Sequence, residues 1–319
     1  EGHTAHATEL EAREETDRML EVYREVLEDV LAVPVLTGKK SESEKFAGAI
    51  DTLCIEAMMG DKKALQAGTS HYLGQNFAKA FEVKFQNEEN KEDYVYATSW
   101  GVSTRLVGAL IMVHGDDKGL RLPPKVAPIQ VVVIPIVRKD DDSSELMDYL
   151  HPLISKLKDS GVRVHVDDRP KMSPGFKFNE WEMKGVPIRL EVGARDMENG
   201  EVFTARRDTG EKFGLTLDAA SVKIPELLDE IQNSLFNQAL EFRAENTHTA
   251  STWDEFKSIV EKGGFIKCGW DGTAETENKI KAETKATIRC IPFDEDPSGI
   301  NCIFSGNAAK HQVVFSKAY

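Results

Sequence analysis

The sequence changes character at residues 122–128, and this change limits the possible folds more than any other feature. The segment LPPKVAP carries Pro123, Pro124 and Pro128. Proline does not continue a helix, so we interpret this segment as a linker. Before it, strand-like runs such as YVYATSW predict an antiparallel sheet. After it, apolar strands alternate with amphipathic helices, which is typical of an α/β domain.

We predict an α+β and α/β multidomain protein, because 319 residues fit two or three domains at roughly 100–200 residues each. The first domain, residues 1–125, begins with a helix over residues 9–33 and has a polar loop at GTSHYLG, before a short helix and a strand. The second, residues 126–247, has a mainly parallel or mixed sheet and ends in a helix over residues 224–246. The third, residues 248–319, is a small α+β module.

Composition indicates a soluble cytoplasmic protein. No apolar run approaches the roughly 18 residues that a membrane helix needs. Four cysteines without CxxC spacing indicate reduced thiols. The net charge is −14, but residues 1–30 hold ten acids and three bases, which is half of the imbalance. A basic patch for nucleic acid elsewhere is therefore compatible with the composition. The chain begins at Glu1 without Met, and we expect it to be a piece of a longer polypeptide.

Arg105 stands where helix electrostatics disfavour a cation. In SWGVSTRLVGALIMV, a strand ends at Gly101, Ser103 or Thr104 is the expected N-cap, and the apolar run predicts a buried helix. The first turn of a helix already carries partial positive charge. Arg105 is therefore either a surface arginine or a fixed cation that holds a ligand anion at the helix start.

Three other motifs leave alternatives open. QAGTSHYLGQN crowds amide, hydroxyl and imidazole groups around two glycines, which suits either a pocket for a polar molecule or a turn before a helix. In EGHTAH, His3 and His6 have no third metal ligand nearby, whereas Glu1 and His3 share one side of a strand. GDDKG is either a cation site or a solvated turn.

Five long segments together resemble prolyl-tRNA synthetases of the archaeal and eukaryote-like type, over essentially the whole chain: EGHTAHAT, EKFAG, LQAGTSHYLGQNFAKAFE, SWGVSTRLVGALIMVHGDDKGLRLPPKVAPIQVVVIPI and PGFKFNEWEMKGVPIRLEVG. The resemblance implies the C-terminal part of a class II catalytic domain, including the end of motif 2 and motif 3, then an anticodon-binding domain and a C-terminal domain. It also implies ATP-dependent ligation of L-proline to tRNA(Pro) through prolyl-adenylate, with Mg²⁺, by a homodimer.

The resemblance assigns residues to three sites. Arg105 is the expected catalytic residue, and the expected ATP contacts are Gln66, Thr69, Ser103 and Arg105. The residues expected around proline are Glu1, His3, Phe46, His71, Ser99, Trp100 and Gly101. The candidates for reading the anticodon are Glu191, Arg195, Asp196, Arg206, Arg207, Asp208 and Lys212.

The sequence departs from the family pattern in two places. The first signature motif and the front strand of the second are missing before EGHT, so we expect a protein beginning at Glu1 not to activate proline. Relatives often hold zinc with four cysteines, where this chain has Cys268, Thr273, Cys302 and Phe304. Two thiols do not complete a structural zinc site, so we expect no zinc.

The spacing between EGHT and SWG leaves no room for the large editing insertion of the bacterial-type enzymes, so we expect no internal editing site. Tyr319 resembles the family's terminal tyrosine, which folds back towards the catalytic domain. The alternative to a ligase is a non-catalytic, synthetase-like protein that binds tRNA or has a regulatory role. Another class II synthetase is a weaker alternative, because GTSHYLGQNF and LPPKVAP resemble the proline family.

Overall fold

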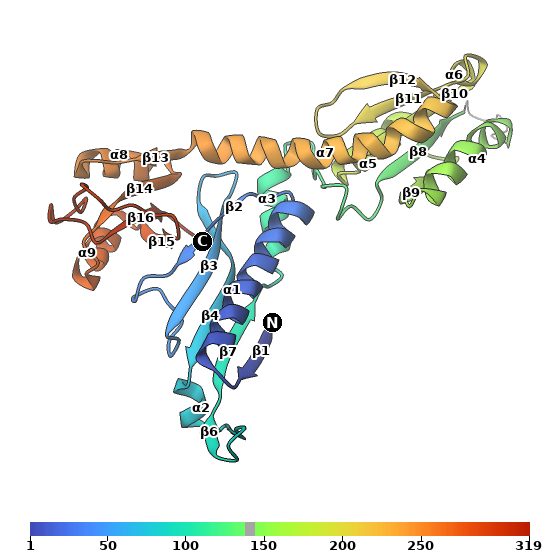
Figure 1. Ribbon diagram of the computed structural model, residues 1–319. Helices are drawn as coiled ribbons and strands as arrows, with labels where there is room; N and C mark the ends of the chain where they lie inside the picture. Colours follow the sequence, from blue (N-terminus) through green and yellow to red (C-terminus); the bar gives the residue numbers. More distant parts are fainter. Residues whose placement is uncertain (138–143) are drawn as a thin grey trace. The chain divides into compact units, whose positions relative to one another are not determined.

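The computed structural model describes residues 1–137 and 144–319, which form two compact units (Figure 1). The first unit contains residues 1–29, 33–113 and 239–319. The second contains residues 30–32 and 114–238. Segments from both ends of the chain therefore fold into one unit.

A nine-stranded sheet organises the first unit, in the order β1-β7-β4-β3-β2-β15-β16-β14-β13. Neighbouring strands are antiparallel except β13 and β14, which are parallel. The pairing of β2 with β15 joins the two ends of the chain, with Lys39 opposite Ile291. The strands are β1 (Gly2–His6), β2 (Val35–Lys39), β3 (Asp51–Met58), β4 (Ala64–Gly74), β7 (Tyr96–Gly101), β13 (Thr247–Thr249), β14 (Phe265–Trp270), β15 (Thr287–Pro292) and β16 (His311–Ser316).

Helix α1 (Glu9–Glu25) lies against the β4 and β7 end of this sheet. Thr8 and Glu11 form a capping box, which satisfies free N–H groups at the helix start. On the buried face, Ser70 Oγ of β4 donates a hydrogen bond to Thr16 O at 2.7 Å. A π-helical turn, Val26–Val30, follows, so the predicted helix at residues 9–33 is confirmed as a helical segment with a shorter α-helical part.

Two sequence-based expectations about the first unit are wrong. GTSHYLG is part of the central strand β4 and not a loop, because its polar residues pair with both neighbouring strands. A Cβ on Gly68 would approach Val102 Cγ1 to 3.0 Å, so close packing favours this glycine. Helix α3 (Arg105–His114) is also less buried than its apolar sequence predicts, since Val107 is 61% exposed and Ile111 is 45% exposed.

The remaining elements of the first unit surround the ends of the sheet. Helix α2 (Asn76–Ala80) and the hairpin β5 (Lys84–Gln86) and β6 (Glu92–Tyr94) follow β4. Helices α8 (Trp253–Lys262) and α9 (Ala274–Thr284) pack on the C-terminal strands. Their core contains Phe256, Ile280 and Phe315.

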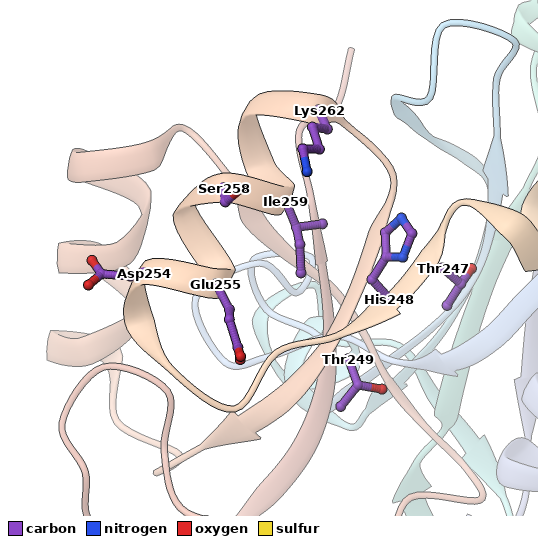
Figure 2. Close-up of a pocket in the computed structure, with 8 residues that line it drawn as sticks. All are labelled: Thr247, His248, Thr249, Asp254, Glu255, Ser258, Ile259 and Lys262. Carbon is purple, nitrogen blue, oxygen red and sulfur yellow. The ribbon is translucent and has the colours of Figure 1, made fainter.

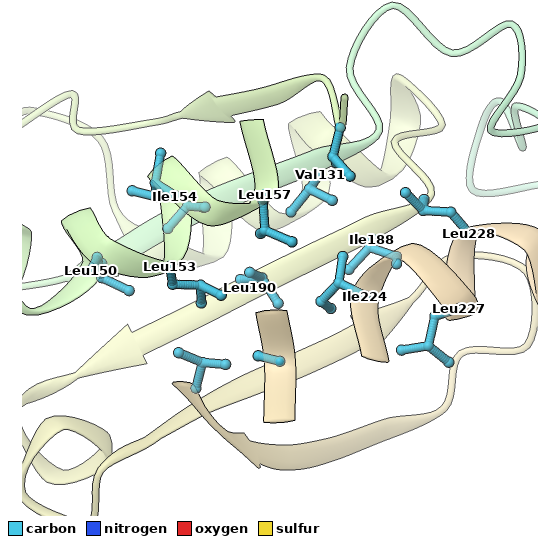
Figure 3. Close-up of a cluster of buried hydrophobic side chains, with 14 of the residues drawn as sticks. Val131, Leu150, Leu153, Ile154, Leu157, Ile188, Leu190, Ile224, Leu227 and Leu228 are labelled. Atoms are coloured by element: carbon cyan, nitrogen blue, oxygen red, sulfur yellow. The ribbon is translucent and has the colours of Figure 1, made fainter. Parts of the chain in front are cut away.

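The second unit is built on a five-stranded sheet in the order β12-β11-β10-β8-β9. Strand β8 is parallel to β9 and β10, whereas β11 and β12 are antiparallel, which confirms a mixed sheet. One face packs on a core that includes Val131, Leu150, Leu190 and Ile224 (Figure 3), and Trp181 of α5 packs on the other face. The elements are β8 (Val131–Ile136), α4 (Ser144–Asp159), β9 (Val164–Val166), α5 (Pro174–Met183), β10 (Ile188–Gly193), α6 (Ala194–Glu198), β11 (Glu201–Arg206), β12 (Lys212–Thr216) and the start of α7 (Leu217–Glu245).

Helix α7 begins earlier than the sequence predicts. It starts at Leu217 and contains Pro225 inside, whereas we expected a start near Ile224. Proline favours the first turn of a helix, whereas Pro225 lies further inside α7. In the described parts of the chain, no helix is both long enough and apolar enough to span a membrane.

A buried ion cluster joins the two ends of the chain inside the first unit. Glu56 of β3 is fully buried and accepts hydrogen bonds from Lys40 Nζ at 2.7 Å and from Arg289 Nε at 3.1 Å. Lys40 Nζ also donates to Arg289 O at 2.7 Å. The three buried charged groups stabilise one another, because burying any one of them without its partners would cost free energy.

Candidate active site

Three adjacent strands bring five of the predicted site residues to one face of the sheet. In the antiparallel register, His3 of β1 lies opposite Ser99 of β7, and Ser99 lies opposite His71 of β4. Thr69 lies opposite Gly101 in the same way. Directly opposed residues in antiparallel strands project to the same face. The sequence therefore correctly grouped residues that are separated along the chain, although their roles stay predictions.

Glu1 joins this face at the edge of the sheet. His3 Nε2 lies 3.1 Å from Glu1 Oε1. A Cβ on Gly101 would lie 3.6 Å from Glu1 Cγ, so the absence of a side chain at Gly101 leaves room beside the carboxylate. Glu1 and His3 thus share one side, as we expected from strand alternation.

Trp100 lies on the opposite face of the sheet. It pairs with Gly2 and Ser70, which alternate with the residues of the candidate site. A Cβ on Gly2 would lie 2.1 Å from Trp100 Cη2, so the indole ring covers Gly2. The structure therefore does not bring Trp100 to the face that carries His71 and Ser99, and strand alternation explains why.

Phe46 provides an aromatic wall beside His71. The ring centroids of Phe46 and His71 are 4.9 Å apart. The buried hydroxyl of Thr52 connects them, because Phe46 N donates to Thr52 Oγ1 at 3.1 Å and His71 Nδ1 lies 2.9 Å from the same oxygen. Burial lowers the pKa of His71, which favours the neutral imidazole. We did not single out Thr52 from the sequence. It lies opposite His71 and shares with Cys54 the face of β3 that continues this site.

Arg105 is the first residue of α3 and is exposed. Its Nη1 donates to Gln66 O at 3.0 Å, and its backbone N donates to Ser103 Oγ at 3.3 Å. The hydrogen bond to Gln66 connects the start of α3 to β4. It lies next to a β-bulge, where Gln66 pairs with Glu56 of β3. The guanidinium and the first-turn N–H groups are thus on one exposed edge, which suits an anion.

The second unit contains a basic cavity of about 260 Å³ that includes some of the predicted anticodon readers. Arg206, Arg207 and Lys212 line it. Sequence reasoning missed further lining residues, and an aromatic residue close to charged residues in FKFNEWEMK was the available signal. The missed residues that the argument below uses are Phe178, Asn179 and Arg189.

Most of the predicted anticodon readers already have partners. Arg206 contacts Asp208 and Glu230, and Arg207 Nη1 donates to Asp116 Oδ2 at 2.8 Å. That hydrogen bond is the main reason why the pKa of Asp116 is lowered to about 2. The predicted turn of Asp116 with Gly119 is present, and within it Asp116 also contacts the cationic side chain of Arg207.

Four of the candidates, Glu191, Arg195, Asp196 and Asp208, do not line the basic cavity. Glu191 forms an ion pair with Arg189 at 2.8 Å, on β10. Asp196 Oδ2 accepts a hydrogen bond from Gly193 N at 2.8 Å and caps α6, which also carries Arg195. The anticodon roles of all these residues stay predictions.

The four positions that the family resemblance compares with zinc ligands have packing or capping contacts here. Cys268 and Cys302 lie in the apolar core of the C-terminal segment, and burial raises the pKa of Cys268. Thr273 caps α9, and the ring of Phe304 lies edge-on to Trp253 at 4.9 Å. Within the described ranges, no group of three or more His, Cys, Asp or Glu residues could hold a metal ion.

A larger open cleft of about 760 Å³ lies between β13 and α8 (Figure 2). Its lining includes His248, Asp254, Glu255 and Lys262, which carry both signs of charge. None of the residues predicted from the sequence lines this cleft.

The C-terminus lies against the start of β4. Ala64 N donates to Lys317 O at 2.8 Å, and Lys63 Nζ lies 4.8 Å from the centre of the Tyr319 ring. The last residues of the chain thus return to the part of the sheet that carries the candidate site, as the family resemblance led us to expect.

The antiparallel sheet, the arginine at the strand–helix junction and the separate α/β unit define a class II aminoacyl-tRNA synthetase. Family models agree: "tRNA synthetase class II core domain (G, H, P, S and T)" matches residues 1–114, and "Anticodon binding domain" matches residues 130–233. "Prolyl-tRNA synthetase, C-terminal" matches residues 253–319. The chain belongs to the proline–tRNA ligase family.

Similar proteins support this membership. The chain is 56% identical to a proline–tRNA ligase of Chloroherpeton thalassium and 52% identical to one of Salinibacter ruber; the alignments cover all of this chain and 67% and 65% of those proteins. A prolyl-tRNA synthetase from Cryptosporidium parvum, solved with L-proline and AMP, is 41% identical with a TM-score of 0.94 over 99% of this chain and 68% of that one. The chain thus spans about two thirds of the length of these relatives.

Proposed function

We propose that the ligation of L-proline to tRNA(Pro) takes place at the face formed by β1, β4 and β7, in an enzyme that contains this chain. A carboxylate oxygen of proline attacks the α-phosphorus of ATP, which forms prolyl-adenylate and releases pyrophosphate. A hydroxyl of the terminal adenosine of tRNA then attacks the prolyl carbonyl carbon, and AMP leaves. The observation that carries the proposal is the grouping of His71, Ser99 and Gly101 on one face, with Arg105 at the junction that follows.

The proline subsite is proposed at Glu1, His3, Phe46, His71, Ser99 and Gly101. Glu1 offers a carboxylate to the secondary ammonium group of proline, and Phe46 offers an aromatic wall to the pyrrolidine ring. Gly101 leaves space for a ligand to approach the backbone. Trp100 would support this subsite from the opposite face of β7.

The ATP subsite is proposed at Gln66, Thr69, Ser103 and Arg105. Arg105 stabilises negative charge on the phosphates without exchanging a proton, since an arginine stays protonated. Mg²⁺ is proposed as the ion that would accompany ATP. The ion supplies charge neutralisation when it is bound.

Thr52→Val is expected to raise the KM for proline about tenfold, because it leaves Phe46 N and His71 Nδ1 without their shared partner and an unmade buried hydrogen bond costs about 1–3 kcal/mol. Valine keeps the shape of threonine, so packing changes little. The measurement is the proline dependence of ATP–pyrophosphate exchange. Thr52→Ser keeps the hydroxyl and should bind proline normally; equal loss in both variants would contradict the proposed role.

We propose that the basic cavity of the second unit receives an unpaired base of the anticodon. Arg189 lies over the ring of Phe178 at 4.5 Å, so both offer flat surfaces for stacking. Lys212 adds positive charge for a phosphate beside the paired guanidinium groups of Arg206 and Arg207, and Asn179 offers an amide for a base edge. Splayed bases of single-stranded RNA are recognised by such a combination of stacking and hydrogen bonds.

Phe178→Ala is expected to weaken binding of tRNA(Pro) by about 5- to 100-fold, since stacking on an aromatic side chain contributes roughly 1–3 kcal/mol per base. Fluorescence anisotropy with labelled tRNA measures the change. Phe176→Ala is the matched control, because Phe176 is on the same helix and is half exposed, but does not line the cavity. Similar losses in both variants would argue against a base-binding cavity.

The alternative is a non-catalytic, synthetase-like protein that binds tRNA or has a regulatory role. The presence of Arg105, Gln66, Thr69 and His71 favours the ligase, because a protein without catalysis does not need them. Proline-dependent ATP–pyrophosphate exchange separates the two: its absence from the enzyme would favour the alternative.

We also propose a cytoplasmic homodimer with three functional segments, 1–125 for catalysis, 126–247 for the anticodon and 248–319 as the C-terminal domain. The free thiols of all four cysteines fit a reducing compartment. The exposed apolar side chains Val107 and Ile111 on α3 fit a surface that becomes covered by protein. A monomer in sedimentation equilibrium at micromolar concentration would contradict the dimer.

A further inference from the structure

The loop at residues 40–50 carries Phe46, and Ser41 organises its first turn. The carbonyl oxygen of Ser41 accepts hydrogen bonds from Glu44 N at 3.1 Å and from Lys45 N at 2.9 Å. The next residue along the chain is Phe46. A displacement of Ser41 would therefore move the turn that leads to the aromatic wall of the proline subsite.

Helix α9 of the C-terminal segment contacts this turn at two points. Ser41 Oγ donates a hydrogen bond to Glu277 Oε1 at 2.7 Å, and both residues are 2% exposed. One helical turn later, Lys281 Nζ donates to Glu44 Oε1 at 2.9 Å at the surface. Ser41 and Glu277 are 236 residues apart in the sequence, so this contact depends on the tertiary fold.

We propose that α9 is a clamp on the Phe46 loop and that Glu277 and Lys281 are positioning residues for proline binding. The clamp rests on the proposed proline subsite, because it acts through the contact of Phe46 with His71. It gives the C-terminal segment a task in the reaction that does not require a metal ion.

The buried contact is the stronger part of the clamp. A serine hydroxyl that donates to a carboxylate inside the protein holds one geometry, because the carboxylate is costly to leave without a donor. The pair of Lys281 and Glu44 is partly exposed, and such pairs contribute little individually. The loop is not part of the proposed ATP subsite, so the clamp affects the KM for proline more than the KM for ATP.

The test uses Ser41→Ala, Lys281→Glu, Glu44→Lys and the double exchange of Glu44 and Lys281. Ser41→Ala is expected to raise the KM for proline about tenfold, with an unchanged KM for ATP. Each charge reversal should raise it about two- to threefold, and the double exchange should restore it. Lys279→Glu is the control, because Lys279 is on the same helix and pairs with Glu275 away from the loop.

Hydrogen–deuterium exchange of residues 41–50 provides a readout that does not depend on catalysis. Faster exchange in Ser41→Ala, with α8 unchanged, supports the clamp. An unchanged loop and an unchanged KM would overturn it, as would an equal effect of Lys279→Glu. If the parent enzyme lacks proline-dependent ATP–pyrophosphate exchange, the proposed function fails, and the exchange of the loop still decides whether the clamp exists.

Discussion

Replacing Arg105 with alanine is expected to lower the rate of proline-dependent ATP–pyrophosphate exchange by about 10²- to 10³-fold, the range typical for removal of one preorganised donor to a transition state. The reason is the position of the guanidinium at the start of α3, where it is held by Gln66 O at 3.0 Å. Arg105→Lys should recover only part of the rate, because lysine keeps the charge but lacks the fork of donors that grips phosphate oxygens.

The control for Arg105 is Arg18→Ala on α1, because Arg18 is a surface residue with a 67% exposed side chain. Thermal unfolding of both variants should stay close to the parent, since exposed hydrogen bonds contribute little to stability. Full exchange activity in Arg105→Ala would remove Arg105 from the ATP subsite. A large loss of stability would instead show that its contact with Gln66 is structural.

Replacing Glu56 with alanine is expected to lower the free energy of unfolding of the first unit by about 3–5 kcal/mol, the usual cost of leaving buried partners without their counter-charge. Lys40 and Arg289 would then be two buried cations without a carboxylate. Urea unfolding followed by circular dichroism measures the change, and amide exchange of β3 and β15 locates it.

Glu89→Ala is the control for Glu56, because Glu89 forms an exposed ion pair with Lys91. It should change stability by less than about 0.5 kcal/mol. Replacing Lys40, Glu56 and Arg289 together with methionine should be less destabilising than Glu56→Ala alone, since no charge then remains buried. Equal stability of Glu56→Ala and Glu89→Ala would mean that the buried cluster does not stabilise the unit.

Local patterns predicted the candidate site unevenly. The sequence correctly placed Arg105 at the start of a helix after a strand, because the glycine, the capping residues and the apolar run lie within a few positions. It failed for GTSHYLG, since polar residues and glycines are typical of loops, yet this segment pairs on both sides as β4. Trp100 could have been separated from Ser99 and Gly101 by strand alternation alone.

The second unit shows the same limit. The predicted charged residues Arg206 and Arg207 were grouped correctly in one hairpin, but their partners Asp208, Glu230 and Asp116 were not foreseen. Phe178 was missed because a single aromatic residue on a helix is usually part of the core. Its contact with Arg189 appears only when α5 and β10 pack together.

The sequence by itself determined the types of most elements, the family and the main candidate residues, because capping boxes, alternation and family motifs are short-range patterns. Only the tertiary structure decided that β2 pairs with β15, that Glu56 lies between Lys40 and Arg289, and that Ser41 meets Glu277. Such contacts depend on strand register and packing between segments more than two hundred residues apart. No local pattern in the sequence predicts that strand register. The buried charged groups and hydroxyls find their partners only when the strands pair in this register.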